Sequence, residues 1–251
     1  MEFRIGDRSL RVNIPDRARL MAELRLRLTE HQGFALATLN LDHLVKLRDD
    51  ADFRAAYLAQ DLVVADGNPV VWLSRLARRP VSLVPGSELV VPLAQLARDC
   101  GRSVALFGSS PEALADATES LTRRLPGLKI SASIAPPMGF DPKSPAADAL
   151  LAQVRDSGAG LCFLALGAPR QEILAARARN IAPQTGFASV GAGLDFLGGH
   201  QKRAPVWVQK IAMEWLWRML SSPRRLAGRY LRCALLLPAL IRDALKLRQS
   251  G

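Results

Sequence analysis

Cysteine is scarce in this 251-residue sequence, which has only three: Cys100, Cys162 and Cys233. Their positions show no paired spacing, so the sequence predicts neither a disulfide framework nor a zinc site. A reducing compartment is therefore the expected environment. With 49% hydrophobic and 23% charged residues, the composition also excludes a disordered or collagen-like chain and is typical of a globular protein with a sizeable core.

Long hydrophobic runs are lacking as well. The longest extends from Cys233 to Ile241 and is interrupted by Pro238. It falls far short of the roughly 20 apolar residues that a membrane-spanning helix needs. The first residues, Met1 to Asp7, lack the charged leader and apolar stretch of an export signal. We therefore expect a cytoplasmic protein without a membrane span.

Patterns that bind metals or dinucleotides are also missing. The histidines show no convergent ligand spacing: His31, His43 and His200. Asp50-Ala51-Asp52 has the D-x-D form of many nucleotide-sugar enzymes, but it falls in a polar, helix-like stretch over residues 42–59, which favours a solvated helix face. Gly191-Ala192-Gly193 begins like the fingerprint G-x-G-x-x-G, yet its sixth position is Phe196, and no P-loop occurs. We expect no bound metal and no cofactor.

Acidic residues are nearly absent from the last fifth of the chain. Residues 199–251 hold 11 of the 34 Lys and Arg residues but only two of the 23 Asp and Glu residues, which gives them a net charge of +9. Residues 1–198 are close to neutral, at +2. Three of the four tryptophans also lie in the basic part: Trp207, Trp215 and Trp217. The sequence therefore predicts a core of residues 1–198 and a basic appendage of residues 199–251.

Short apolar runs alternate with stretches of helical periodicity along the core. The predicted strands cover residues 34–39, 61–65, 103–107, 129–134, 161–166 and 187–190. The predicted helices with clear start signals cover residues 17–31, 112–124 and 170–181, and a hairpin is expected over 3–12. This alternation predicts an α/β fold with a mostly parallel sheet flanked by helices, followed by a helical, basic C-terminal appendage.

Polar and glycine residues gather where the predicted strands end. They are Thr38 and Asn40, Asp66 to Asn68, Gly108 to Ser110, Gly139-Phe140, Gly167 to Glu172, and Gly191 to Gly193 with Asp195. In an open parallel sheet, ligands bind at the carboxyl ends of the strands, beside helix N-termini and loop amides. The sequence therefore predicts a ligand site at this edge of the sheet.

Two of these strand ends have more than one interpretation. Asp66 follows an apolar strand and precedes a glycine, where a carboxylate can act as a general base on a sugar hydroxyl. A helix cap or turn aspartate is the alternative. The stretch Gly167 to Glu172 places small residues and a proline at a strand-to-helix turn, so its amides can approach a phosphate or sugar. An ordinary turn is the alternative.

The appendage has the pattern of a basic amphipathic helix. Arg225, Arg229 and Arg232 are spaced to lie on one helical face. Apolar contacts would come from Leu226, Leu231 and Leu235 to Leu237. Such a helix, accompanied by tryptophans, fits an anionic membrane surface. A solvated helix face and a nucleic-acid patch are the alternatives.

An ordered series of motifs is similar to a known family. The motifs are Thr38-Leu39-Asn40, Ala65-Asp66-Gly67, Gly86-Ser87-Glu88-Leu89, Leu106-Phe107-Gly108, Gly139-Phe140, Leu166 to Glu172, Gly191 to Asp195, Arg203-Ala204-Pro205, Glu214 to Arg218 and Pro223-Arg224-Arg225. In this order they resemble the WecG/TagA/CpsF glycosyltransferases, glycosyltransferase family 26, over about residues 35–230. Each motif alone is weak, but the ordered set is specific.

The resemblance implies a Rossmann-like core and an inverting, metal-independent glycosyltransferase. Such an enzyme moves a hexose from a UDP-sugar to a sugar on undecaprenyl diphosphate at the inner face of the bacterial membrane. Similar chains use UDP-N-acetylmannosamine, its uronic acid or UDP-glucose. The implied partners are this donor, the polyprenyl-diphosphate-linked acceptor and an anionic membrane surface, and no nucleic acid. A homo-oligomer stays open, because the apolar surface of the appendage could pair with another chain.

Residue roles follow from the resemblance by position. Asp66 would be the base that deprotonates the acceptor hydroxyl. The sugar pocket would be shaped by Thr38, Asn40 and Gln171, and the turn from Gly191 to Gly193 would lie close to the nucleotide.

The resemblance also implies a role for the appendage, which would support membrane association and close over the active site. Its Arg218 and Arg225 would approach the UDP diphosphate and neutralise the departing charge. Two positions depart from the family pattern: Leu83 and Gly228 stand where arginine is frequent, and Arg229 is the candidate substitute for the second.

The leading hypothesis is therefore a membrane-surface UDP-hexose glycosyltransferase that builds a polyprenol-linked repeat unit for an exopolysaccharide or related surface glycan. The alternative is a non-catalytic basic module that binds RNA or anionic lipid through residues 199–251.

Overall fold

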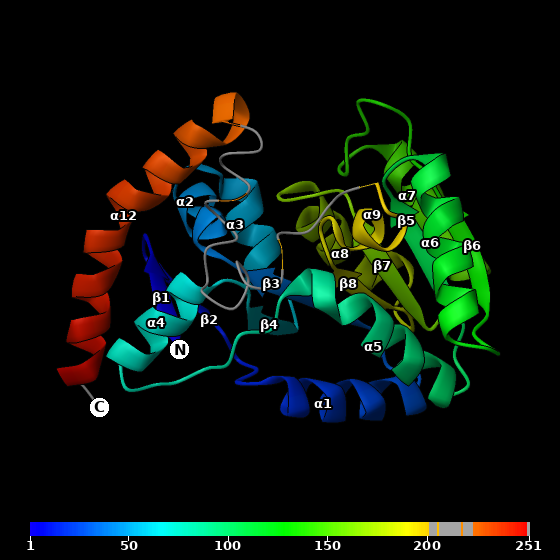
Figure 1. Ribbon diagram of the computed structural model, residues 1–251, viewed down its shortest axis with the longest axis horizontal. Helices are drawn as coiled ribbons and strands as arrows, with labels where there is room; N and C mark the ends of the chain where they lie inside the picture. The colour runs from blue at the N-terminus through cyan, green and yellow to red at the C-terminus, as the bar shows by residue number, and fades with distance from the viewer. Residues whose placement is uncertain (201–204, 206–216, 218–222, 250–251) are drawn as a thin grey trace.

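The computed structural model describes residues 1–200, 205, 217 and 223–249, with only the backbone described at 223–225. Within these residues, six strands form one parallel sheet in the order β4-β3-β8-β7-β5-β6 (Figure 1). The strands are β3 (Phe34–Leu39), β4 (Leu62–Ala65), β5 (Val104–Gly108), β6 (Ile130–Ile134), β7 (Leu161–Ala165) and β8 (Gly186–Ser189). The predicted α/β fold with a parallel sheet is confirmed.

Burial explains why these segments form strands. Every residue of β3 and of β7 is buried, because helices cover both faces of a parallel sheet. The edge strand β6 instead alternates between partly buried and exposed positions along its length. The other edge strand, β4, is also buried at every residue, so alternation marks only the β6 edge of the sheet.

Helices pack on both faces of the sheet in two hydrophobic clusters. One face is covered by α1 (Arg17–Thr29), α5 (Gly86–Asp99), α6 (Pro111–Arg124) and α9 (Gly193–Leu197). The other face is covered by α7 (Pro145–Asp156) and α8 (Arg170–Ile181). Local caps start several of these helices: the Asp16 side chain accepts a hydrogen bond from the Arg19 amide at 2.8 Å, and Ser110 and Ser144 cap α6 and α7.

A third hydrophobic cluster joins the β3–β4 edge of the sheet to the first residues of the chain. It includes the helices α2 (Leu41–Asp49), α3 (Ala51–Leu58) and α4 (Asn68–Leu76). The predicted hairpin is confirmed as β1 (Glu2–Ile5) and β2 (Arg8–Arg11), which pair antiparallel around a turn at Gly6 and Asp7.

The helix α12 (Pro223–Gln249) lies against α2, α4 and β1, at the left of Figure 1. Its buried residues Leu236, Leu240 and Ala244 belong to the third cluster. The same hydrophobic cluster therefore joins this part of the predicted appendage to the core. The division of the chain at residue 198 stays a prediction. Among the described helices, none is long and apolar enough to cross a membrane.

The predicted helix-like character of residues 42–59 is confirmed, and the stretch forms two helices because the chain breaks at Asp50. Asp50 is extended, with φ −107° and ψ 106°, and its side chain accepts a hydrogen bond from the Phe53 amide at 2.9 Å, which caps α3. The Arg54 guanidinium donates to the Leu47 and Arg48 carbonyls at the end of α2. Asp52 is exposed and pairs with Lys143 at 2.7 Å.

Candidate functional site

The parallel sheet brings Asp66 and Asn40 to neighbouring strand ends. Leu39 of β3 is paired with Ala65 of β4, and the Asp66 amide donates to the Leu39 carbonyl at 2.7 Å. Asp66 is half-buried. Gly67 has a φ of +109°, a conformation that favours glycine, and a Cβ there would lie 3.7 Å from Asn40 Cβ. The chain can therefore turn closely beside Asn40 directly after Asp66.

Thr38 marks the meeting point of three elements. A Cβ on Gly86, the first residue of α5, would lie 3.0 Å from Thr38 Oγ1 and 3.4 Å from the Ser189 carbonyl oxygen at the end of β8. The lack of a side chain at Gly86 allows α5 to start this close to the two strand ends. Thr38 is nearly buried as a result.

The turn after β8 is held from two sides. The Gly191 amide donates to Gln171 Oε1 on α8 at 3.1 Å. A Cβ on Gly193 would lie 2.8 Å from Val90 Cγ2, so the turn also packs tightly against α5. The structure thus brings the predicted residues Gln171, Gly191 and Gly193 together. Gln171 itself is only 2% exposed.

Asn40 is anchored to the helix that follows it. Its Oδ1 accepts a hydrogen bond from the His43 amide at 3.1 Å, which caps α2, and its Nδ2 lies 3.3 Å from His43 Nε2. His43 Nδ1 lies 3.1 Å from the Tyr57 hydroxyl. Burial lowers the pKa of His43 to about 3. The ring is therefore neutral, and accepting from Asn40 leaves its proton on Nδ1, where it donates to Tyr57.

Glu172 is a buried carboxyl group beside this site. Its side chain has no exposed surface, and burial raises its pKa to about 7, against the lowering effects of the hydrogen bond from Gln171 and of the Lys46 charge. Its Oε1 accepts from Gln171 Nε2 at 2.8 Å. Burial raises the pKa of the Tyr57 hydroxyl, and the charges of Glu172 and Asp66 raise it further. Glu172 and Asp66 therefore both lie close enough to Tyr57 to act on its hydroxyl.

Arg229 pairs with an acidic residue of the core. Its Nε lies 3.0 Å from Asp42 Oδ1, and Lys46 Nζ lies 2.9 Å from Asp42 Oδ2. Lys46 also donates to the Ala168 carbonyl at 3.1 Å, in the turn between β7 and α8. Since Asp42 lies in the first turn of α2, two residues after Asn40, the ion pair joins α12 to the rim of the site.

The other two arginines are not placed by the structure. Arg218 lies outside the described residues, as do Trp207 and Trp215, and the side chain of Arg225 is likewise outside them. Leu83, one of the departures from the family pattern, forms a parallel bridge with Ala65 and is exposed. It therefore lies at the rim beside Asp66. Gly228 lies in α12 with open space where a side chain would be.

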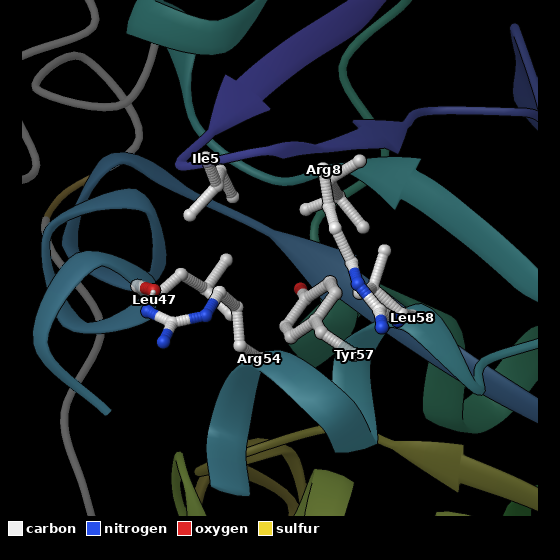
Figure 2. Close-up of a pocket in the computed structure, with 7 residues that line it drawn as sticks. Ile5, Arg8, Leu47, Arg54, Tyr57 and Leu58 are labelled. Atoms are coloured by element: carbon white, nitrogen blue, oxygen red, sulfur yellow. Dashed lines mark hydrogen bonds between the residues drawn. The ribbon is translucent and has the colours of Figure 1, made fainter. Parts of the chain in front are cut away.

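Two cavities of the described chain lie away from these strand ends. Figure 2 shows the first, between the hairpin and α3, where Ile5 and Arg8 face Arg54 and Tyr57. Its volume of about 10 Å³ has room for about one water molecule, so it is too small for a sugar. The second is an open groove of about 340 Å³ beside Arg11. Neither cavity is lined by a predicted site residue.

Sequence reasoning missed several residues around the site. No sequence pattern marks Asp42, His43 or Tyr57. Their partners are distant in sequence: His43 contacts Tyr57, and Asp42 pairs with Arg229. Glu172 lies within the motif Leu166 to Glu172, but nothing in the sequence indicates that its side chain is buried. Among the described residues, no group of three or more His, Cys, Asp or Glu side chains is placed to hold a metal ion.

The arrangement suits chemistry on a hydroxyl group. A half-buried carboxylate, Asp66, lies at a glycine-rich edge beside Asn40, and a carboxylate in such a place can take a proton from a bound hydroxyl. A family model described as the glycosyl transferase WecG/TagA/CpsF family matches residues 8–250, nearly the whole chain. The chain therefore belongs to the WecG/TagA/CpsF family and is a glycosyltransferase, an enzyme that moves a sugar from a donor to an acceptor.

Proposed function

We propose that the protein transfers a hexose from a UDP-sugar to a sugar on undecaprenyl diphosphate, with inversion and without a metal. The donor would be UDP-N-acetylmannosamine, its uronic acid or UDP-glucose. The product would be a polyprenol-linked intermediate of an exopolysaccharide or related surface glycan. The observation that carries this proposal is the position of Asp66 beside Asn40 in a chain that belongs to this glycosyltransferase family.

In the proposed reaction, the Asp66 carboxylate takes the proton of the acceptor hydroxyl. The hydroxyl oxygen attacks the anomeric carbon from the face opposite UDP, forming the new glycosidic bond as the bond to the UDP oxygen breaks. Arg218 and Arg225 would neutralise the charge that develops on the diphosphate. Arg229 would have to leave Asp42 to take part, because the two are paired at 3.0 Å.

The binding roles follow the positions of the side chains. Asn40, which is partly exposed, would border the sugar, and the nearly buried Thr38 would shape the pocket from the core side. The turn from Gly191 to Gly193 would border the nucleotide. Gln171 would shape the site indirectly, by supporting the turn at Gly191, because it is buried and hydrogen-bonded to the Gly191 amide.

We also propose that residues 199–251 attach the enzyme to the inner face of the cell membrane and close over the site. The support comes from α12, which exposes several large apolar side chains although its inward face already packs on the core. Leu231, Leu235, Ile241 and Leu245 are exposed there. The exposed basic residues Arg232, Arg242 and Lys246 lie on the same helix. An apolar strip with basic neighbours fits an anionic lipid surface.

The reaction is tested by screening UDP-sugars against short-chain prenyl-diphosphate-linked sugar acceptors and determining the anomeric configuration of the product. We expect one donor to be used, and Asp66→Ala to lower kcat by at least about 100-fold, in the range of general-base catalysis.

The matched control is Asp52→Ala, which removes an exposed carboxylate of the D-x-D sequence and should leave the rate within about twofold. Absence of turnover with every donor, or an Asp66→Ala variant as active as the wild type, would overturn the proposed reaction.

A further inference from the structure

Three residues form a continuous chain of hydrogen bonds beneath the proposed nucleotide turn. Glu172 Oε1 accepts from Gln171 Nε2 at 2.8 Å. The other end of the same carboxamide, Gln171 Oε1, accepts from the Gly191 amide at 3.1 Å. Both side chains are at least 98% buried. These buried hydrogen bonds connect the start of α8 to the turn after β8.

A glutamate is energetically unfavourable at this buried position. Its second oxygen, Oε2, is buried and makes no hydrogen bond within the described part of the chain. Burying a carboxyl group with an unsatisfied oxygen costs free energy that an apolar side chain of similar size would not. Packing alone therefore does not account for a glutamate here, whereas its bond to Gln171 does.

The bond matters because a carboxamide has two different ends. With an acceptor opposite Nε2, the oxygen of Gln171 points at the Gly191 amide, which needs an acceptor. Rotated by half a turn, the Gln171 amino group would face the Gly191 N–H, and two donors would oppose each other. A carboxyl group at position 172 accepts in either protonation state, because one oxygen always remains an acceptor. It therefore selects the favourable orientation.

The backbone of Glu172 is itself held in place. Gln60 Nε2 donates to the Glu172 carbonyl at 3.1 Å and to the Ala56 carbonyl at 2.9 Å, which fixes the first turn of α8 against α3. Gly191 has a φ of +56°, so its turn depends on a conformation that is easily changed in a glycine. A fixed acceptor on α8 would restrain that turn.

We propose that Glu172 is a positioning residue, which orients the Gln171 carboxamide and through it holds the turn from Gly191 to Gly193 in the shape that binds the nucleotide. The positioning of the turn is a property of this chain alone, and its link to nucleotide binding rests on the proposed function.

The first test observes the Gly191 amide directly. Val190-Gly191 is the only Val-Gly step in the sequence, so labelling valine carbonyls with ¹³C and glycine amides with ¹⁵N gives one selected NMR signal, that of Gly191. In Glu172→Leu we expect this signal to shift and its hydrogen exchange to become at least about tenfold faster, because the acceptor is no longer held. Glu172→Gln keeps an acceptor and should preserve both properties.

Two further variants serve as controls for misfolding and for the general effect of losing a buried hydrogen bond. Glu172→Asp keeps the carboxyl group but shortens the side chain by one methylene, so it should behave like Glu172→Leu. It provides the test if the leucine variant does not fold. Thr185→Val removes a buried hydrogen bond to the Ala159 carbonyl at the opposite end of β8 and should leave the Gly191 signal unchanged. An unchanged signal in both Glu172→Leu and Glu172→Asp would overturn the proposal.

The second test measures the consequence for the donor. We expect Glu172→Leu to raise KM for the UDP-sugar about tenfold with a smaller change in kcat, as for a lost binding interaction, and Glu172→Gln to stay within about twofold of the wild type. A fall in kcat alone would overturn the link to nucleotide binding. If the wild type turns over no UDP-sugar, the proposed function fails, and the Gly191 signal still decides whether Glu172 positions the turn.

Discussion

Asp66 and Glu172 are carboxyl groups near the same strand ends, but their surroundings differ. Asp66 is half-buried at the end of β4, beside the turn that passes Asn40. Glu172 is fully buried on α8 and bonded to Gln171. Only a group that retains some exposure can meet a substrate hydroxyl without rearrangement of the core. The two acids therefore suit different tasks, proton transfer for Asp66 and support of the site for Glu172.

Glu172 should make the stability of the protein depend on pH. Burial raises its pKa to about 7 in the folded chain, whereas an exposed glutamate in the unfolded chain has a pKa of about 4.3. The folded state therefore binds a proton more tightly, and the resulting stabilisation is present below about pH 4 and lost as the pH rises through 7. Each unit of pKa difference corresponds to about 1.4 kcal/mol.

The measurement is urea unfolding of the wild type and of Glu172→Gln between pH 4.5 and 8. We expect the unfolding free energy of the wild type to fall relative to that of the variant as the pH rises to about 7, and the difference to stay constant above it. Neighbouring His43 and Tyr57 stay neutral over this range, because burial lowers the pKa of the first and raises that of the second. Parallel curves would mean that Glu172 titrates like an exposed glutamate.

The strands were the elements that sequence predicted best. β3 has the predicted bounds, and the other five strands of the sheet differ from the predicted ranges by one residue at one or both ends. The reason is physical: a strand covered on both faces needs a continuous apolar run, and such runs are visible in sequence. The edge of the sheet where Asp66, Asn40 and Gly191 gather followed from the parallel arrangement alone.

Contacts between elements distant in sequence could not be predicted in the same way. The break between α2 and α3 depends on Asp50, which ends one helix and caps the next. Arg229 is the predicted substitute for the arginine that the family often has at position 228, but its pairing with Asp42 depends on how α12 packs against α2. The role of Glu172 could not be predicted without knowing that this side of α8 is buried. A sequence pattern indicates which face of a helix or strand is apolar, but it does not indicate which other element packs against that face.

The ion pair between Arg229 and Asp42 should anchor α12 to the core. Asp42 is nearly buried, and the Arg229 side chain is 39% exposed, so solvent screens part of the attraction. We expect a double-mutant cycle with Asp42→Asn and Arg229→Gln to give a coupling energy of about 1 kcal/mol in urea unfolding.

The control for this cycle is the exposed pair of Arg123 and Glu119 on α6, in which both side chains are more than 70% exposed. The cycle with Arg123→Gln and Glu119→Gln should give no more than about 0.5 kcal/mol. Equal coupling in the two cycles would show that the Arg229 pair does not anchor α12.

The charge of the whole molecule is unevenly distributed, and α12 gives part of that imbalance a place in the structure. The helix has one acidic residue, Asp243, and its inward face is already used for packing on α2, α4 and β1. What remains outward is an apolar strip with basic neighbours, including Arg232 and Lys246. This arrangement supports the proposal that the appendage contacts an anionic lipid surface instead of stabilising the core alone.

The outward face of α12 provides the test of membrane association. Leu231 and Leu235 lie one turn apart and are 61% and 72% exposed. We expect Leu231→Asp combined with Leu235→Asp to weaken binding to phosphatidylcholine–phosphatidylglycerol vesicles at least about tenfold in co-sedimentation, because apolar burial is lost and anionic lipid repels the new charges.

The control is Leu26→Asp, at a 52% exposed position on α1, which should bind like the wild type. Salt should weaken wild-type binding only in part, since the apolar contribution is not screened. Wild-type binding by the double variant, or a double variant that instead loses a dimer or RNA affinity, would overturn the membrane assignment of this face.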